Sequence, residues 1–214
     1  KNYDADTVDE FKPENKTGLQ RLLNLPAEEN VPMIAMITRL ASHKGIDIVR
    51  SAFNEIMKKG VQFVVLGTGE PDHENFFRHM QNVYGNRVRA IISFNKDLAQ
   101  KIYAGADIFL MPSKSEPCGL SQMMAMRYGT VPIVRATGGL KDSVIDCGDG
   151  KSGNGFCFSG YDAGDLLYAV DRAVGLYRDY SDIFKGLRRR AMKYDFSWGR
   201  SAKEYDEYYN EVLG

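Results

Sequence analysis

Short, continuously apolar runs alternate with longer amphipathic runs over residues 31–160 of the chain. The apolar runs read Val-Val-Leu or Ile-Phe-Leu-Met without polar alternation, which predicts strands that are covered on both faces. The longer runs have helical spacing; in 45–59 the residues Ile46, Val49, Phe53 and Ile56 share one face. The alternation therefore predicts an α/β fold, a doubly wound six-stranded parallel sheet between two layers of helices.

The same pattern sets the expected boundaries. We expect strands at 33–37, 62–66, 88–92, 107–111, 131–135 and 156–158, and helices between them at 45–59, 73–84, 96–104, 119–128 and 140–146. After residue 160 the pattern is wholly helical, with runs at 163–178, 181–193 and 200–213. Residues 1–30 are polar, with one short helix expected to end near Asn24. This predicts a lead-in segment over 1–30, the sheet domain over 31–195 and a C-terminal helix within 196–214.

Composition narrows the classes of function. At 214 residues and 43% hydrophobic, the chain can bury the core of a single domain. Its 28 basic and 28 acidic residues cancel, so no general field attracts nucleic acid or an anionic membrane. We therefore expect neither as a partner, and any bound anion requires a local cluster of cations.

The cysteines and histidines predict no metal site. Cys118, Cys147 and Cys157 have neither metal-ligand spacing nor the density of a disulfide framework, and the odd count favours a reduced, cytoplasm-like compartment. The three histidines are scattered. No apolar run approaches 18 residues and the first ten residues are polar, so we expect neither a membrane span nor a signal peptide.

The candidate functional residues lie in loops that directly follow predicted strands. Glu116-Pro117-Cys118-Gly119-Leu120 lies between the strand at 107–111 and the next helix, whose first N–H groups have no partner within the helix and favour phosphate. Arg39 and Lys44 follow the strand at 33–37, and Thr137-Gly138-Gly139 follows the strand at 131–135. Parallel strands end at one edge, so we expect these three loops to converge on a pyrophosphate.

The positions of Arg39 and Lys44 favour a role in anion binding over that of ordinary solvated surface cations. Cations at a helix N-terminus oppose the helix dipole and gain nothing unless an anion lies there. Each cation about 4 Å from a phosphate, at an effective dielectric near 20, contributes up to about 4 kcal/mol before desolvation is subtracted.

Glu116 and its neighbours each leave two interpretations open. A carboxylate beside a pyrophosphate is repulsive, so Glu116 is expected to face sugar hydroxyls or a positive charge that develops during reaction; the alternative is a helix-start carboxylate stabilised by the dipole. Cys118 is interpreted as a small packing residue because no histidine is near it in sequence. Phe94 opens a polar loop, where its ring either stacks on a base or packs in the core.

Gly67-Thr68-Gly69 resembles part of a dinucleotide motif, but the motif requires a third glycine where Asp72 stands and follows the first strand rather than the second. We therefore interpret these glycines as a strand-to-helix turn that requires positive φ, and we disfavour an oxidoreductase.

Taken in order, these motifs resemble the C-terminal half of bacterial glycogen synthases and plant starch synthases. The resemblance is carried by Thr38-Arg39-Leu40, Lys44-Gly45, Gly67-Thr68-Gly69, Pro112-Ser113, Glu116-Pro117-Cys118-Gly119-Leu120, Met126-Arg127-Tyr128-Gly129, Thr137-Gly138-Gly139-Leu140, Asp142 and Asp195-Phe196-Ser197-Trp198. It spans nearly the whole chain and is somewhat greater to the bacterial enzymes.

The resemblance implies the Rossmann-like C-terminal domain of a retaining, metal-independent GT-B glycosyltransferase. Such an enzyme passes glucose from ADP-glucose to the non-reducing end of an α-1,4-glucan. It implies catalytic roles for Arg39 and Lys44 on the diphosphate and for Glu116 near the glucosyl unit. It also implies main-chain contacts to sugar and phosphate from Cys118, Gly119, Leu120 and Ser121, and stacking of Phe94 on adenine.

Four positions depart from the family pattern. Lys114-Ser115 replaces arginine and phenylalanine, His43 replaces a common glutamine, and Phe94 replaces the usual tyrosine. The family's N-terminal domain, with much of the acceptor site, does not match any part of this chain. We therefore expect the chain alone to bind ADP but to be largely inactive, with its last helix crossing to that domain.

The resemblance also sets the expected compartment, which is the cytoplasm for a bacterial protein and the plastid for a plant protein. Two alternatives stay open. One is the equivalent half of a GT-B transferase that uses a UDP- or GDP-sugar, and the other is a non-catalytic nucleotide-binding module.

Overall fold

The buried strands form one sheet in the computed structural model, which describes residues 1–213 except for the side chain of Glu204. The six-stranded sheet has the order β3-β2-β1-β4-β5-β6, and every neighbouring pair is parallel. The strands are β1 Met33–Ile37, β2 Gln62–Leu66, β3 Val88–Ile91, β4 Ile108–Met111, β5 Val131–Arg135 and β6 Phe156–Phe158. The predicted doubly wound parallel sheet is therefore confirmed.

The helices follow the predicted amphipathic runs closely. They are α1 Val8–Leu22, α2 Ile46–Lys58, α3 Pro71–Tyr84, α4 Lys96–Gly105, α5 Ser121–Arg127, α6 Gly138–Ser143, α7 Ala163–Asp179, α8 Ser181–Lys193 and α9 Trp198–Leu213, with short 3-10 turns at Ser42–Lys44 and Gly85–Arg87. The helix expected from residue 119 begins at Ser121 because Gly119 has a φ of +72°.

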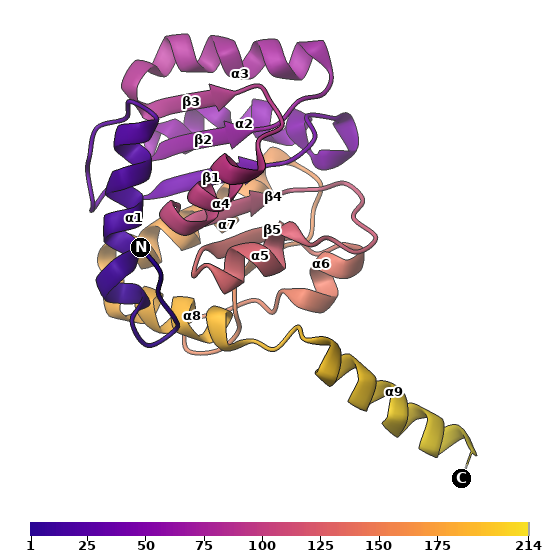
Figure 1. The fold of residues 1–214 in the computed structure, drawn as a ribbon. Coiled ribbons are helices and arrows are strands. Elements are labelled where there is room, and N and C mark those ends of the chain that lie inside the picture. Colours follow the sequence, from indigo (N-terminus) through magenta and orange to yellow (C-terminus); the bar gives the residue numbers. More distant parts are fainter. Residues whose placement is uncertain (214) are drawn as a thin grey trace.

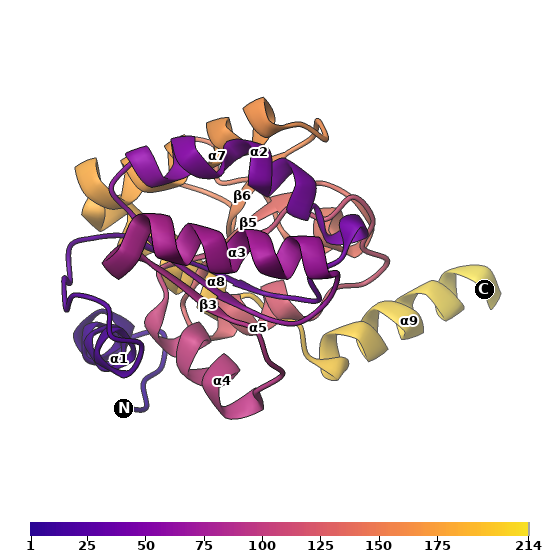
Figure 2. The same cartoon turned by 90° about the horizontal axis from the view of Figure 1, so that it is seen from above.

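Alternate strand residues point into two separate cores, as the two-fold period of a strand requires. In β1, Ile34 and Met36 pack with α2, α3 and α7, whereas Met33 and Ala35 pack with α1, α4, α5 and α6. Figure 2 shows α2 and α7 on one side of the sheet and α4 on the other. Both faces are thereby covered, which explains why the strands lack polar alternation.

The last helix stands apart from this arrangement. In Figures 1 and 2, α9 projects away from the sheet and its covering helices. Its large side chains are exposed, with Trp198 at 89% and Leu213 at 83%. Exposed aromatic and apolar groups in such number are typical of a surface that another element covers.

Gly67 and Gly69 are turn residues, but the predicted reason is wrong. Neither has a positive φ. Instead, the chain after β2 lies so close to the chain after β1 that a methyl group on Gly67 would overlap the carbonyl oxygen of Thr38, and one on Gly69 that of Leu40. The two loops are also joined by the Leu40 N–H, which donates to the Thr68 carbonyl at 2.9 Å. Close backbone approach therefore requires both glycines.

Candidate functional site

The order of the strands reverses between β1 and β4, and the loops that leave these two strands meet there. In open α/β sheets the crevice at such a switch point, outside the carboxyl ends of the strands, is where ligands bind. Gly45, with a φ of +76°, lies directly against the Pro112 carbonyl, where any side chain would collide. The Lys114 N–H donates to the His43 carbonyl at 2.9 Å, which holds the two loops together.

Lys44 and Glu116 form an ion pair across this junction. The Lys44 Nζ lies 2.5 Å from Glu116 Oε2, and the side chains are 17% and 11% exposed. The Ser113 hydroxyl donates to the same carboxylate oxygen at 3.3 Å. The structure thus brings two of the three predicted catalytic residues into direct contact, although they are 72 positions apart. The Glu116 carboxylate offsets the charge of Lys44.

Arg39 lies on the same loop as Lys44 but faces another neighbour. A terminal guanidinium nitrogen of Arg39 is 3.3 Å from His43 Nε2. Arg39 also lines a hollow of about 220 Å³ together with Thr68, Phe94 and Lys96. The predicted cation and the predicted aromatic residue therefore share one cavity, at the carboxyl ends of β1, β2 and β3.

Phe94 is on the surface, not in the core. Its side chain is 83% exposed in the loop between β3 and α4. The packing alternative for this ring is therefore wrong, and its face is available to a planar ligand in the hollow.

The glycines of the third loop support the Glu116 segment from behind. Gly138 has a φ of +46°, and a methyl group on it would overlap the Glu116 carbonyl; one on Gly139 would overlap the carbonyl of Cys118. The Gly139 N–H donates to the Glu116 carbonyl at 3.1 Å. These two residues therefore fix the position of the loop, and direct contact of Thr137, Gly138 or Gly139 with a ligand stays a prediction.

Cys118, Leu120 and Ser121 follow Glu116 along the chain, after β4 and up to the first residue of α5. Cys118 and Leu120 are exposed, and Ser121 is the first residue of α5. Burial raises the pKa of the Tyr103 hydroxyl on α4, and a hydrogen bond with Ser121 opposes that rise.

Gln122 and Ser143 were not predicted, yet they connect the two glycine loops. The fully buried Gln122 amide donates to the Gly119 carbonyl and to the Ser143 hydroxyl, both at 2.9 Å. Ser143 in turn donates to the Gly139 carbonyl at 2.6 Å. The available signal was a glutamine on the apolar face of α5, shared with Ala125 and Met126, where a polar group requires an internal partner.

Arg135 is a second residue that the sequence did not single out. It ends β5, and its guanidinium donates to the Lys114 carbonyl at 3.0 Å. It also lies 5.3 Å from the centre of the Tyr161 ring. Tyr161 donates to Asp47 at 2.5 Å, and burial followed by this carboxylate raises the pKa of its hydroxyl. Arg135 therefore fixes the segment that leads to Glu116.

Two further observations concern metals and membranes. Among the described residues, no group of three or more His, Cys, Asp or Glu side chains is placed to hold a metal ion. None of the helices in the described part of the chain is long and apolar enough to span a bilayer.

Comparison with known proteins identifies the family. The model of the family "Glycosyl transferases group 1" matches residues 24–186, which is more than half of the chain. The chain belongs to the group 1 glycosyltransferases. The relatives include the glycogen synthase of Anoxybacillus flavithermus, 48% identical over 99% of this chain and 43% of the relative. That of Thermosipho melanesiensis is 49% identical over 99% of this chain and 44% of the relative.

A solved structure agrees with these relatives. The catalytic domain of starch synthase IV from Arabidopsis thaliana, bound to ADP and acarbose, is 38% identical with a TM-score of 0.88, over 98% of this chain and 44% of that one. The resemblance to glycogen and starch synthases is therefore confirmed, as is the GT-B type of fold. This group 1 glycosyltransferase chain spans less than half the length of the relatives it matches.

Proposed function

We propose that this chain is the donor half of an ADP-glucose-dependent glycogen or starch synthase, which transfers glucose with retention to the non-reducing end of an α-1,4-glucan. The observation that carries the proposal is the Lys44–Glu116 pair at the switch point of the sheet. The identity to glycogen synthases and to the ADP-bound starch synthase supports the choice of substrate.

Arg39 and Lys44 would neutralise the diphosphate as it leaves. When the bond between the glucosyl C1 and the phosphate oxygen breaks, the electron pair goes to that oxygen. Cations already positioned there stabilise this charge more in the transition state than in the bound substrate, which is the requirement for catalysis. Lys44 is 17% exposed, so its charge is only partly screened by water.

Glu116 would exchange partners when the donor binds. In the structure its carboxylate is held by Lys44 and Ser113. A diphosphate competes for Lys44, and the carboxylate then has capacity for the sugar hydroxyls or for an oxocarbenium-like charge at C1. The glucosyl unit would therefore lie beside Glu116, with the main chain of Cys118 to Ser121 on its phosphate side.

The adenine base would occupy the hollow beside Phe94. The volume of about 220 Å³ and the 83% exposed ring provide a stacking surface next to Arg39. No metal is proposed in this mechanism, because Arg39 and Lys44 supply the positive charge.

The remaining parts of the active site would come from a second domain. The chain spans less than half the length of its relatives, and the exposed side chains of α9 favour a crossing to that domain. The glucan acceptor would lie mainly on the second domain, so we expect the 214-residue chain to bind ADP but to turn over little substrate. The bacterial relatives support a cytoplasmic location over a plastid one.

Two alternatives differ from this proposal in measurable ways. A transferase for a UDP- or GDP-sugar would keep the Lys44–Glu116 pair but prefer another base in the hollow beside Phe94. A non-catalytic module would bind a nucleotide through Lys44 and would tolerate Glu116→Gln without any change in function of the two-domain protein.

The deciding experiment is calorimetric titration of the chain with ADP, UDP, GDP and ADP-glucose, each with and without EDTA. We expect ADP to bind more tightly than UDP or GDP, with the same affinity in EDTA. Tighter binding of UDP or GDP would replace the donor while keeping the fold. An affinity for ADP that falls in EDTA would contradict the metal-independent mechanism.

A further inference from the structure

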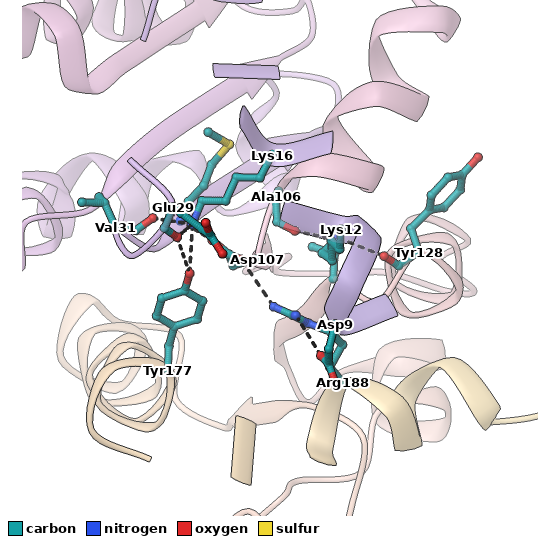
Figure 3. A network of polar contacts seen from close by, with 12 residues as sticks. Asp9, Lys12, Lys16, Glu29, Val31, Ala106, Asp107, Tyr128, Tyr177 and Arg188 are labelled. Carbon is teal, nitrogen blue, oxygen red and sulfur yellow. Dashed lines mark hydrogen bonds and ion pairs between the residues drawn. The ribbon is translucent and has the colours of Figure 1, made fainter. Parts of the chain in front are cut away.

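Lys12 binds the C-terminal ends of two helices at once. This lysine on α1 is 2% exposed, and its ammonium donates to the carbonyls of Tyr103 at 3.2 Å and Ala104 at 3.0 Å in the last turn of α4. It also donates to the Tyr128 carbonyl at 2.9 Å, which directly follows α5. The Lys12 amino group thus donates to carbonyls at the ends of two helices, although burial lowers the pKa of this group well below its ordinary value; Figure 3 shows Lys12 beside Tyr128.

Tyr3 binds the same pair of carbonyls. Its hydroxyl lies 2.8 Å from the Tyr128 oxygen and 3.2 Å from the Ala104 oxygen. The packing agrees with this arrangement, because Gly105 at the end of α4 lies against Leu19 of α1. Two side chains of the N-terminal segment therefore hold the ends of α4 and α5 in a fixed relation.

The opposite ends of these two helices carry the candidate site. Phe94 and the capping residue Asn95 immediately precede α4, and the Asn95 side chain accepts from the Leu98 N–H. The loop from Glu116 leads directly into Ser121 at the start of α5. Each helix is short, with 10 residues in α4 and seven in α5, so a shift at one end moves the loop at the other.

We propose that Lys12 and Tyr3 are positioning residues for the donor site, and that they set the distance between the Phe94 loop and the Glu116 loop by holding the far ends of α4 and α5. The nucleotide-binding part of this inference rests on the proposed function. The ordering of the two loops does not, because it is a property of the ligand-free chain.

Lys16 supplies a matched control on the same helix. It is 3% exposed and makes four polar contacts, as Lys12 does when its contact with the Thr130 hydroxyl at 2.8 Å is added to those with the three carbonyls. Its partners are Asp107, Tyr177 and the carbonyls of Glu29 and Val31. Asp107 follows the end of α4 by two residues, but none of the four belongs to α4, to α5, or to the loops that carry Phe94 and Glu116. Loss of Lys16 therefore removes a buried lysine with four polar contacts and leaves the carbonyls at the two helix ends with their partners.

The first experiment compares Lys12→Met with Lys16→Met by amide hydrogen exchange without ligand. We expect Lys12→Met to accelerate exchange at least about tenfold more over 93–105 and 116–128 than over the rest of the chain. Lys16→Met should show no such local excess. An increase of equal size in both variants, or one spread uniformly over the chain, overturns the inference.

Tyr3→Phe and Tyr177→Phe form a milder pair that tests the same point if a lysine variant does not fold. Each removes one hydroxyl group, that of Tyr3 from the helix ends and that of Tyr177 from the Lys16 group. We expect the same local pattern of exchange for Tyr3→Phe only, with a smaller amplitude. Identical exchange in the two tyrosine variants contradicts the role of the N-terminal segment.

Titration with ADP then connects the loops to binding. We expect Lys12→Met to weaken ADP binding at least tenfold and Tyr3→Phe about threefold, with Lys16→Met and Tyr177→Phe within twofold of the unmodified chain. If the unmodified chain does not bind ADP, the proposed function is wrong, while the exchange data still decide the positioning role. If ADP binds and all four variants bind it equally, the positioning role is wrong.

Discussion

Charged side chains cluster at both edges of the sheet, but the two clusters differ in how exposed they are to a ligand. At the carboxyl edge, Lys44 and Glu116 are 17% and 11% exposed and lie beside open loops. At the amino edge, Lys16 and Asp107 are 3% and 4% exposed, and their ammonium and carboxylate are 2.7 Å apart (Figure 3). The carboxyl edge can exchange a partner for a substrate, whereas the amino-edge pair is almost fully buried, although it lines a cavity of about 250 Å³.

This difference in exposure distinguishes a charged side chain that can bind a ligand from one that stabilises the fold. Asp107 accepts from Lys16, from the Met33 N–H at 2.9 Å and from Arg188 at 3.5 Å. Each of these groups would be left buried without that acceptor if the carboxylate were removed. The Lys44 side chain is 17% exposed and its partner is a carboxylate, so Lys44 can pair with an anion instead at much lower cost.

The largest expected effect is the loss of stability in Asp107→Asn. Removal of one partner from a buried ion pair costs about 3–5 kcal/mol, because the remaining charges stay buried. Urea denaturation should show a corresponding shift in the midpoint, with ADP affinity of the folded protein within twofold of the unmodified chain. The control is Asp182→Asn, since the 96% exposed Asp182 lies 3.7 Å from Lys185 and should leave the midpoint unchanged. Equal midpoints for the two variants would remove the distinction between the edges.

The next effect is on ADP binding at the carboxyl edge. We expect Lys44→Ala and Arg39→Ala each to weaken ADP binding about 10- to 100-fold, or roughly 1.4–2.7 kcal/mol. This is less than the unscreened Coulomb value because desolvation is subtracted. Stability should change little, since neither side chain is fully buried. Calorimetry with ADP measures the affinity, and urea denaturation of the same samples measures the stability.

Glu116→Gln separates charge from shape in this test. It keeps a group of the same size beside Lys44 but removes the competing negative charge. We expect ADP to bind equally well or more tightly, in contrast to Lys44→Ala. Weaker ADP binding in Glu116→Gln would mean that the carboxylate positions Lys44 for the anion rather than competing with it.

The hydrophobic pattern predicts the strands and the loops at the carboxyl edge, but it does not predict the buried lysines at the amino edge. Strands covered on both faces leave continuous apolar runs, so 131–135 was predicted with the boundaries observed. The loop residues of the candidate site were predicted because they follow those strands directly. Lys12 and Lys16 were not predicted. Lys12 contacts Tyr103 and Lys16 contacts Asp107, and each acceptor is 91 positions away in the sequence. Within α1 they look like ordinary polar positions, and only tertiary packing buries them.

Gln122 was missed for a related reason. A glutamine in a short helix has no local feature that distinguishes an exposed amide from a buried one. Its two acceptors, Gly119 and Ser143, belong to different loops that approach only in the folded chain. The positive φ expected for Gly67 failed similarly, since the close approach of Thr38 depends on the pairing of β1 with β2.

A smaller effect is expected from the aromatic ring in the hollow. Stacking of a base on an aromatic side chain contributes about 1–3 kcal/mol when measured by substitution with alanine. Phe94 is 83% exposed and lines the hollow, so we expect Phe94→Ala to weaken ADP binding about 5- to 20-fold. Phe94→Tyr keeps the face of the ring and should bind ADP within threefold of the unmodified chain. Unchanged binding in Phe94→Ala would place the base outside the hollow.

The smallest expected effect is a difference in reactivity among the three cysteines, and its measurement requires no substitution. Burial raises the pKa of the Cys147 thiol to about 11 and that of Cys157 to about 12, with Asp146 as the second cause. Both are therefore almost fully protonated at pH 8, and we expect alkylation by iodoacetamide to occur first at the exposed Cys118. Mass spectrometry of the native chain gives the order of modification.

Saturating ADP should slow the modification of Cys118 severalfold, because its loop is expected to lie against the diphosphate. The rates at Cys147 and Cys157 are the internal control, since these residues lie around β6, away from the loops of the proposed site. Equal slowing at all three thiols would indicate a general tightening of the fold. Protection confined to Cys118 would locate the ligand at the carboxyl edge, and unchanged alkylation of Cys118 would show that its loop does not cover the nucleotide.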